Sequence, residues 1–197
     1  MSTARLEAFS DGVIAIAITL LVLDIKVPPP GGGGLGHALA DQWPVYAAYV
    51  VSFLTIGVIW INHHASIGRL ARADHTVLVL NLLLLLAVGA LPFTTSLMAS
   101  YLRESSGQHL AAAVYAGSFL ALGCVFFGLN LYALRARPGL LHEGIDAPTR
   151  RLLIRRNAAG LAPYAVAVAI APVSSYATLA ICAAVAVYYG WPRAADP

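Results

Sequence analysis

The chain has 197 residues, of which 59% are apolar and only 11% are charged, and its mean hydropathy is +0.77. Soluble domains carry about 25% charged residues, so the composition excludes an ordinary soluble protein and predicts an all-α integral membrane protein. The net charge of +3 does not indicate a nucleic-acid partner, because the basic residues flank apolar runs and form no continuous stripe.

The first predicted helix, residues 5–27, carries a carboxylate at each end of its apolar run. The stretch between Asp11 and Asp24 is about 18 Å of helix, whereas the hydrocarbon core is about 30 Å thick. A charged group that faces lipid at this depth costs about 2.5 kcal/mol or more. We therefore expect this helix to face protein or water, as a pore-lining helix does, and to be retained rather than cleaved as a signal peptide.

Uncharged runs long enough to cross a bilayer predict the other helices. A Pro- and Gly-rich loop, residues 28–34, follows the first helix, and Pro172 divides the long uncharged stretch 157–192 into a hairpin. The predicted spans are residues 5–27, 42–68, 76–102 with Pro92 as a kink, 105–134, 147–171 and 176–191. We expect one domain, residues 1–197, with six transmembrane helices, or five if the last pair is a re-entrant hairpin.

Basic residues are distributed unevenly over the two sides of this arrangement. With the N-terminus inside, only Lys26 and Arg103 fall on the outer side. The ten on the inner side are Arg5, Arg69, Arg72, Arg135, Arg137, Arg150, Arg151, Arg155, Arg156 and Arg193. This positive-inside bias predicts a multi-pass protein with both termini in the cytoplasm. The bias also explains the basic loop 135–156, for which contact with anionic lipid is a weaker explanation.

Three large apolar residues of the first helix share one face. Ile16, Leu20 and Leu23 are spaced by four and three residues, and Thr19 lies beside them. Around an axis, such side chains block ions by dewetting, and a ring of hydroxyl groups replaces part of an ion's water shell. One subunit cannot enclose a pore with one helix, so this hypothesis requires a cyclic oligomer. Packing of the same side chains on other helices explains the spacing equally well.

A second group of polar residues, Trp60, Asn62, His63 and His64, lies near the inner end of the second predicted helix. Buried charges persist only when they are paired or hydrogen-bonded. We expect one polar network of Arg5, Ser10, Asp11, Asn62, and His63 or His64, with Asn81 as a further candidate. Adjacent histidines point to different helix faces, which disfavours a shared metal ion. A proton relay is an alternative role, and a histidine pair that holds helices in register is the simpler one.

Motifs of several other protein classes are absent from the sequence. There is no Thr-Val-Gly-Tyr-Gly filter, no arginine-rich voltage-sensor helix and no nucleotide-binding motif. Cys124 and Cys182 lie in apolar runs without metal-ligand spacing, and no nucleophile–base pair indicates catalysis. We therefore expect a protein that is not an enzyme and that uses no cofactor or metal.

The first-helix segment Arg5-x-x-x-Phe9-Ser10-Asp11-Gly-Val-x-Ala-Ile-x-Ile-Thr-Leu-Leu-Val-Leu resembles the signature of a cation-channel family. It is the family of the endolysosomal potassium channel transmembrane protein 175 and its bacterial relatives. The Trp60-x-Asn62-His63-His64 segment and the stretch from Asn81 to Pro92-Phe93 resemble its second and third helices.

The resemblance implies a homotetramer of six-helix subunits whose first helices line the pore. It implies that Ile16, Leu20 and Leu23 form the constriction and that Thr19 contributes to selectivity. The residues implied to brace the assembly are Arg5, Phe9, Ser10, Asp11, Trp60, Asn62, His63 and His64.

The resulting hypothesis is a potassium-selective, leak-like cation channel in a bacterial plasma membrane, with potassium ions and bilayer lipid as its partners. A proton-coupled secondary carrier that uses Asp11 and the histidine pair is one alternative. A non-conducting membrane scaffold is the other.

Overall fold

The computed structural model describes residues 3–30 and 34–190. In this part of the chain the regular structure is helical, and the only extended pairing is an isolated bridge between Leu70 and Leu141. The α-helices are α1 (Thr3–Leu20), α2 (Leu35–Asp41), α3 (Trp43–Gly68), α4 (His75–Tyr101), α5 (Gln108–Leu131), α6 (Ala147–Ala159), α7 (Ala162–Ile170) and α8 (Ser175–Gly190). Two short 3-10 helices, η1 (Leu21–Asp24) and η3 (Pro138–Leu140), and one π-helical segment, η2 (Tyr132–Ala136), complete the set.

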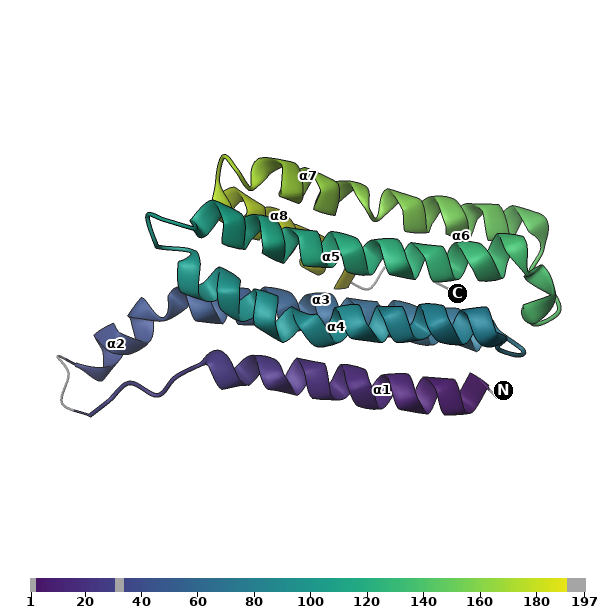
Figure 1. Ribbon diagram of the computed structural model, residues 1–197, viewed down its shortest axis with the longest axis horizontal. Coiled ribbons are helices and arrows are strands. Elements are labelled where there is room, and N and C mark those ends of the chain that lie inside the picture. Colours follow the sequence, from purple (N-terminus) through teal and green to yellow (C-terminus); the bar gives the residue numbers. More distant parts are fainter. Residues whose placement is uncertain (1–2, 31–33, 191–197) are drawn as a thin grey trace.

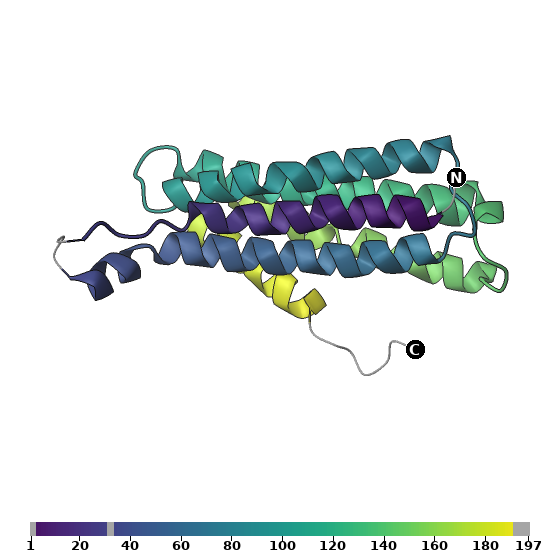
Figure 2. The ribbon, with the colours of Figure 1, turned by 90° about the horizontal axis from the view of Figure 1, so that it is seen from below.

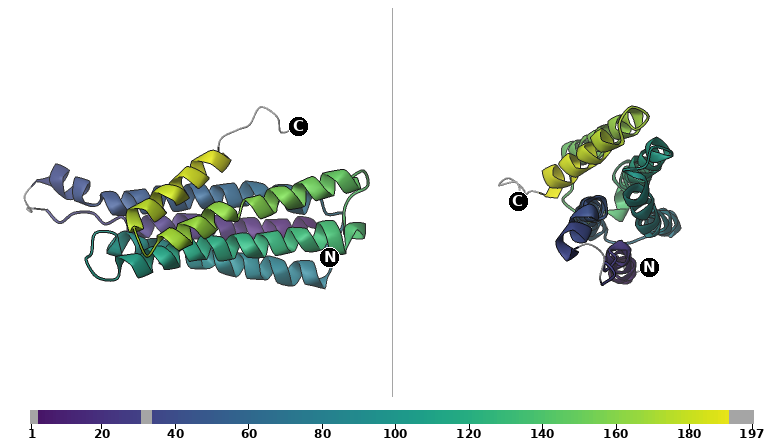
Figure 3. Two further views of the ribbon diagram at one scale, coloured as in Figure 1. Left: turned by 90° about the horizontal axis from the view of Figure 1, so that it is seen from above. Right: turned by 90° about the vertical axis from the view of Figure 1, so that its left-hand side faces the viewer.

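The long helices lie side by side in one elongated bundle (Figure 1). Helix α1 packs against α3 and α4, α4 packs against α5, and α5, α7 and α8 contact one another. Figure 2 shows α1 lying over α3 and α4, and the end-on view in Figure 3 places it at the edge of the bundle. One side of α1 is therefore covered by its own subunit and the other is not.

Among residues 3–30 and 34–190, four helical segments are long and apolar enough to cross a membrane: Thr3–Asp24, Trp43–Gly68, His75–Tyr101 and Gln108–Ala136. Helix α8 is apolar but shorter. Helices α6 and α7 follow one another along the length of the bundle (Figure 1). The prediction of an all-α integral membrane protein is confirmed. The observed α3 and α4 each lie within one residue of the predicted spans 42–68 and 76–102.

The first predicted helix is three residues too long. The α-helix ends at Leu20, the chain continues as η1 to Asp24, and Ile25 is already extended. Pro28 disfavours helical geometry at the residue before it, which explains part of this early end. The short helix α2, between the loop and α3, was not predicted.

The fifth predicted helix, residues 147–171, is interrupted. Helix α6 ends at Ala159 and α7 begins at Ala162. Pro163 has no N–H to donate to the carbonyl of Ala159, so a continuous helix is disfavoured here.

The fourth predicted helix, 105–134, starts at Gln108 and continues past Leu131 as η2. The end of the sixth predicted helix at Trp191, and Arg193, lie outside the described residues.

Hydroxyl groups are paired inside the apolar core between α3, α4 and α5. The Ser52 hydroxyl lies 2.7 Å from Thr95 Oγ1 and 2.9 Å from the Tyr115 hydroxyl, and all three residues are buried. The Thr95 hydroxyl donates to the carbonyl of Leu91, next to Pro92. Helix α4 continues through Pro92 without a break. This cluster was not predicted, because Ser and Thr in a membrane helix give no sign of which neighbour they meet.

Asp74 caps the N-terminus of α4 at the connection from α3. Its carboxylate accepts the backbone N–H of Val77 at 2.9 Å and the hydroxyl of Tyr132 at 2.7 Å. These hydrogen bonds, the one from Val77 first, lower the pKa of the Asp74 carboxyl below its usual value. The cap therefore joins the start of α4 to η2, at the end of the bundle that also holds the start of α1.

We expect the substitution Asp74→Ala to destabilise the protein by about 1 to 2 kcal/mol, since it removes an N-cap and a tertiary hydrogen bond. In a protein of this size the melting temperature then falls by about 2 to 8 °C. A thermal melt of the purified protein in detergent measures this. Because the pKa of Asp74 is lowered in the folded state, its contribution is present above the unfolded pKa of about 3.9 and disappears as pH falls through the folded value.

The matched control is Asp146→Ala. Asp146 caps α6 in the same way, through the backbone N–H of Thr149 at 2.9 Å, but α6 has no buried residues. Loss of this cap frays α6 locally and moves the global melt less. Equal shifts for the two variants would contradict the role assigned to Asp74.

Candidate functional site

Helix α1 has two distinct faces. The buried residues Leu6, Ser10, Ile14, Ala17 and Leu21 recur every three or four positions, as one face of a helix does. On the opposite side, Ile16, Leu20 and Leu23 are 60%, 43% and 63% exposed, and Thr19 between them is exposed as well. Arg5, Phe9 and Gly12 are exposed and continue this line toward the N-terminus.

The structure excludes packing of the apolar stripe on helices of its own subunit, whereas packing on a neighbouring subunit is untested. Ile16, Leu20 and Leu23 do not pack in the core of their own subunit, because α3 and α4 cover the other side of α1. At the edge of the bundle the stripe faces lipid, another subunit or an axis between subunits (Figure 3). We refer to Ile16, Thr19, Leu20 and Leu23 as the outward stripe.

The hydroxyl group of Thr19 is exposed, and its hydrogen is used in a hydrogen bond within α1. The hydroxyl donates to the carbonyl of Ile16 at 2.9 Å. A threonine hydroxyl has one donor and two acceptor lone pairs, so in this arrangement the lone pairs are the part left for a ligand. Such an oxygen suits a cation rather than an anion.

A buried chain of hydrogen bonds fixes α1 to α3 and α4. Asn81 Nδ2 donates to Ser10 Oγ at 2.9 Å, and Ser10 donates to the carbonyl of Leu6 at 2.8 Å. Asn81 Oδ1 lies 2.8 Å from His63 Nε2, so the proton of the imidazole is placed on Nε2. Ser10, His63 and Asn81 are all fully buried. His63 Nδ1 is buried without a hydrogen-bond partner among the described residues.

A second set of contacts lies beside this chain. Trp60 Nε1 donates to Asp11 Oδ1 at 2.8 Å, and Glu7 lies against His64 with its Oε1 2.5 Å from Nδ1. Glu7 and Asp11 are one helical turn apart, so both carboxylates meet the same side of α3. Glu7 was not singled out from the sequence, although its spacing of four from Asp11 was visible there.

The single network expected from the sequence is thus two separate sets of contacts. Ser10, His63 and Asn81 form the buried chain, whereas Asp11, Trp60 and His64 lie in the second set with Glu7. Arg5, Phe9 and Asn62 join neither. The amide of Asn62 donates to Val58 of its own helix, and Arg5 and Phe9 are exposed.

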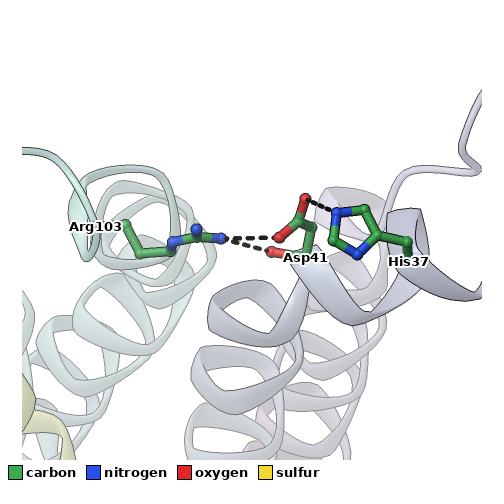
Figure 4. Close-up of polar contacts among 3 residues, drawn as sticks. All are labelled: His37, Asp41 and Arg103. Atoms are coloured by element: carbon green, nitrogen blue, oxygen red, sulfur yellow. Dashed lines mark hydrogen bonds and ion pairs between the residues drawn. The ribbon is translucent and has the colours of Figure 1, made fainter. Parts of the chain in front are cut away.

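Polar contacts also hold the opposite end of α1 and its surroundings. Ser96 donates to Asp24 Oδ1 at 3.1 Å, which ties η1 to α4. Farther out, Arg103 Nη1 lies 3.3 Å from Asp41 Oδ1, and His37 lies 3.7 Å from the other carboxylate oxygen (Figure 4). This cluster attaches α2 to the end of α4. Within residues 3–30 and 34–190, no three His, Cys, Asp or Glu side chains are placed to share a metal ion.

Comparison with known proteins places this arrangement in a family. The profile described as endosomal/lysosomal potassium channel TMEM175 matches residues 5–92. A potassium channel of Streptomyces collinus is 48% identical over 99% of this chain and 95% of its own length, and one of Chamaesiphon minutus is 43% identical over 95% and 93%. The chain belongs to the TMEM175 family of ion channels.

Solved structures agree with this assignment. The crystal structure of a lysosomal potassium-selective channel TMEM175 homolog from Chamaesiphon minutus has a TM-score of 0.84 at 40% identity and covers 95% of both chains. Animal relatives match over a smaller part of their own length. The chicken endosomal/lysosomal proton channel TMEM175 is 39% identical over 55% of this chain and 23% of the chicken protein. The family resemblance expected from the sequence is confirmed, as is the expectation that the protein is not an enzyme.

Asn81 is the central member of the buried chain, and its replacement tests that chain. We expect Asn81→Leu to lower the free energy of unfolding by about 1 to 3 kcal/mol for each polar group left without its partner, here His63 Nε2 and Ser10 Oγ. The thermal melt of the purified protein measures the loss.

Asn62→Leu is the matched control, since among the described residues the Asn62 amide bonds only within α3. We expect a small change for this variant. A control that melts as early as Asn81→Leu would show that the buried chain has no special contribution to stability.

Proposed function

We propose that the protein is a potassium-selective, leak-like cation channel, assembled as a homotetramer with α1 of each subunit at the central pore. The observation that carries the proposal is the outward stripe of α1. It points away from its own subunit and combines large apolar side chains with one hydroxyl oxygen. The near full-length relatives that carry the name potassium channel support the choice of ion.

Ile16, Leu20 and Leu23 form the constriction in this proposal. Leu23 follows Ile16 by seven positions, which corresponds to about 10 to 12 Å along α1 and η1. Four copies of each side chain around an axis make successive apolar rings, which exclude ions by dewetting when the pore is narrow. Thr19 lies among these rings, where four oxygen atoms with free lone pairs replace part of the water shell of a potassium ion.

Asp11 and Asp24 lie near the two ends of the constriction. Each carboxylate is held by one hydrogen bond, from Trp60 and from Ser96, and both are only partly covered. Negative charge at both mouths of a pore raises the local concentration of cations. We propose that these residues attract potassium to the pore without binding it tightly.

The orientation follows from the distribution of basic residues. Nine of the eleven Lys and Arg residues in the described part of the chain lie at the end of the bundle where α1 begins, and only Lys26 and Arg103 lie at the other. Under the positive-inside rule this end faces the cytoplasm. We therefore propose a bacterial plasma-membrane protein with its N-terminus and C-terminus inside.

The proton-coupled carrier has less support. A relay from Asp11 to the histidine pair needs a connected path of hydrogen bonds. Among the described residues, Asp11 is bonded to Trp60 and His63 to Asn81, and no hydrogen bond joins Asp11 to His63 or His64. A non-conducting scaffold does not account for the hydroxyl oxygen in the outward stripe.

We expect the purified protein in liposomes to carry potassium faster than sodium, and Ile16→Asn to increase the flux of both ions. Asparagine wets the constriction, so the barrier falls and the ratio of potassium to sodium flux falls with it. A fluorescence flux assay with an ionophore reference measures both rates. Slow, saturable flux coupled to proton movement would instead support the carrier.

Leu86→Asn is the control for this variant. Leu86 is 72% exposed on α4 and does not belong to the outward stripe. We expect its flux and its ion ratio to equal those of the unmodified protein. If Ile16→Asn behaves like this control, Ile16 does not line the pore.

Thr19 is tested by two substitutions that differ in the hydroxyl group. Thr19→Val keeps the shape but removes the oxygen, and we expect the ratio of potassium to sodium flux to fall toward one. Thr19→Ser keeps the oxygen and retains selectivity. The same liposome assay compares them, and an unchanged ratio in the valine variant would remove Thr19 from the selectivity proposal.

A further inference from the structure

A cavity lined mainly by arginines lies at the end of the bundle where α1 begins. Its volume is about 490 Å³, and it lies between η2 and α6. The basic lining residues are Arg135, Arg150, Arg151 and Arg155, and the apolar ones include Leu134 and Ile154. No acidic residue of the described chain lines it. The outward stripe of α1 is not part of this cavity.

The positive charge in the cavity is uncompensated within the described residues. None of the four arginines forms an ion pair there, and Arg150 Nε is buried without a hydrogen-bond partner. Asp146 is near Arg150, but its pKa is lowered chiefly by the hydrogen bonds with Thr149 and only weakly by Arg150. Its carboxylate is therefore engaged in capping α6.

The local geometry makes this arrangement mildly unfavourable without an anion. Arg151 and Arg155 are four residues apart on α6, and like charges at this spacing destabilise a helix. Arg150 and Arg151 also lie near the N-terminus of α6, the positive end of the helix dipole. A negative group among the four side chains offsets both effects.

We propose that this cavity is a binding site for a phosphate group, either the headgroup of an anionic phospholipid or a free phosphate ion. Guanidinium groups bind phosphate oxygens through paired N–H donors. The site lies where the membrane-spanning segment Gln108–Ala136 ends, at the depth of lipid headgroups. Leu134 and Ile154 provide an apolar wall beside the charges, as the glycerol and acyl region of a lipid requires. The positive-inside rule explains basic residues at this end but not their convergence on one cavity.

The experiment counts lipids bound to the purified full-length protein by native mass spectrometry. The protein in neutral detergent is titrated with phosphatidylglycerol or phosphatidylcholine. We expect phosphatidylglycerol to bind more tightly, and Arg151→Gln and Arg155→Gln to weaken it by about tenfold each, the equivalent of one charge-assisted hydrogen bond. Arg72→Gln, an exposed arginine at the same end outside the cavity, leaves binding unchanged.

A parallel arm identifies the source of the phosphate. Inorganic phosphate is added and the melting temperature is recorded for the same proteins. The site takes free phosphate if phosphate raises the melting temperature of the unmodified protein but not of Arg151→Gln, and the two lipids bind equally. Preference for phosphatidylglycerol that depends on Arg151 and Arg155 assigns the site to lipid. Equal binding of both lipids with no effect of phosphate overturns the proposal, as does an equal loss in Arg72→Gln.

Discussion

The hydrogen bonds from Ser10 through Asn81 to His63 determine how α1 is rotated about its own axis. Inside an apolar bundle, a polar side chain without a hydrogen-bond partner lowers the stability of the fold. The buried amide of Asn81 has Ser10 Oγ as its acceptor, so Ser10 faces α3 and α4, and Ile14, Ala17 and Leu21 follow it into the same interface. A shift of α1 by one residue turns each side chain by about 100° and breaks this chain. The buried chain of hydrogen bonds therefore also determines the direction in which the outward stripe points.

The other helices hold α3 and α4, against which α1 packs, in place. Helices α3, α4 and α5 are joined by the hydroxyl cluster of Ser52, Thr95 and Tyr115, and the hairpin of α7 and α8 packs on α3 and α5. Helix α1 is attached on one side only. A helix placed this way leaves its other side for lipid or for neighbouring subunits, and in a family of ion channels this is the position that suits a pore-lining element.

The two ends of the molecule differ in their charge chemistry. At one end, arginines gather around the connections between helices, and desolvation and the nearby Arg156 both lower the pKa of Arg69. At the other end, Asp41 and Arg103 form an ion pair, and Asp24 accepts a hydrogen bond from Ser96. In our proposal this asymmetry sets the orientation in the membrane. It also concentrates positive potential around the cavity between η2 and α6. A single property of the sequence thus acts, in our proposals, on both membrane orientation and ligand binding.

Several features followed directly from local patterns in the chain. Apolar runs of membrane length predicted the segments that became α3 and α4, and the spacing of Ile16, Leu20 and Leu23 predicted that they share a face. Pro163, which lies at the break before α7, was also visible in the sequence, but the prediction used only Pro172 to divide this stretch. These properties depend on residues close together in sequence, so no knowledge of the neighbours is needed to recognise them.

Tertiary structure decided what each polar side chain meets. His63 and His64 are adjacent and chemically identical, but a turn of 100° directs His63 to Asn81 on α4 and His64 to Glu7 on α1. The amide of Asn62, in the same motif, donates to Val58 of its own helix. The sequence by itself determined a helical membrane protein with a charged, striped first helix. Only the packing of α1 on α3 and α4 decided which side of that helix is buried, because burial depends on contacts between segments far apart in the chain.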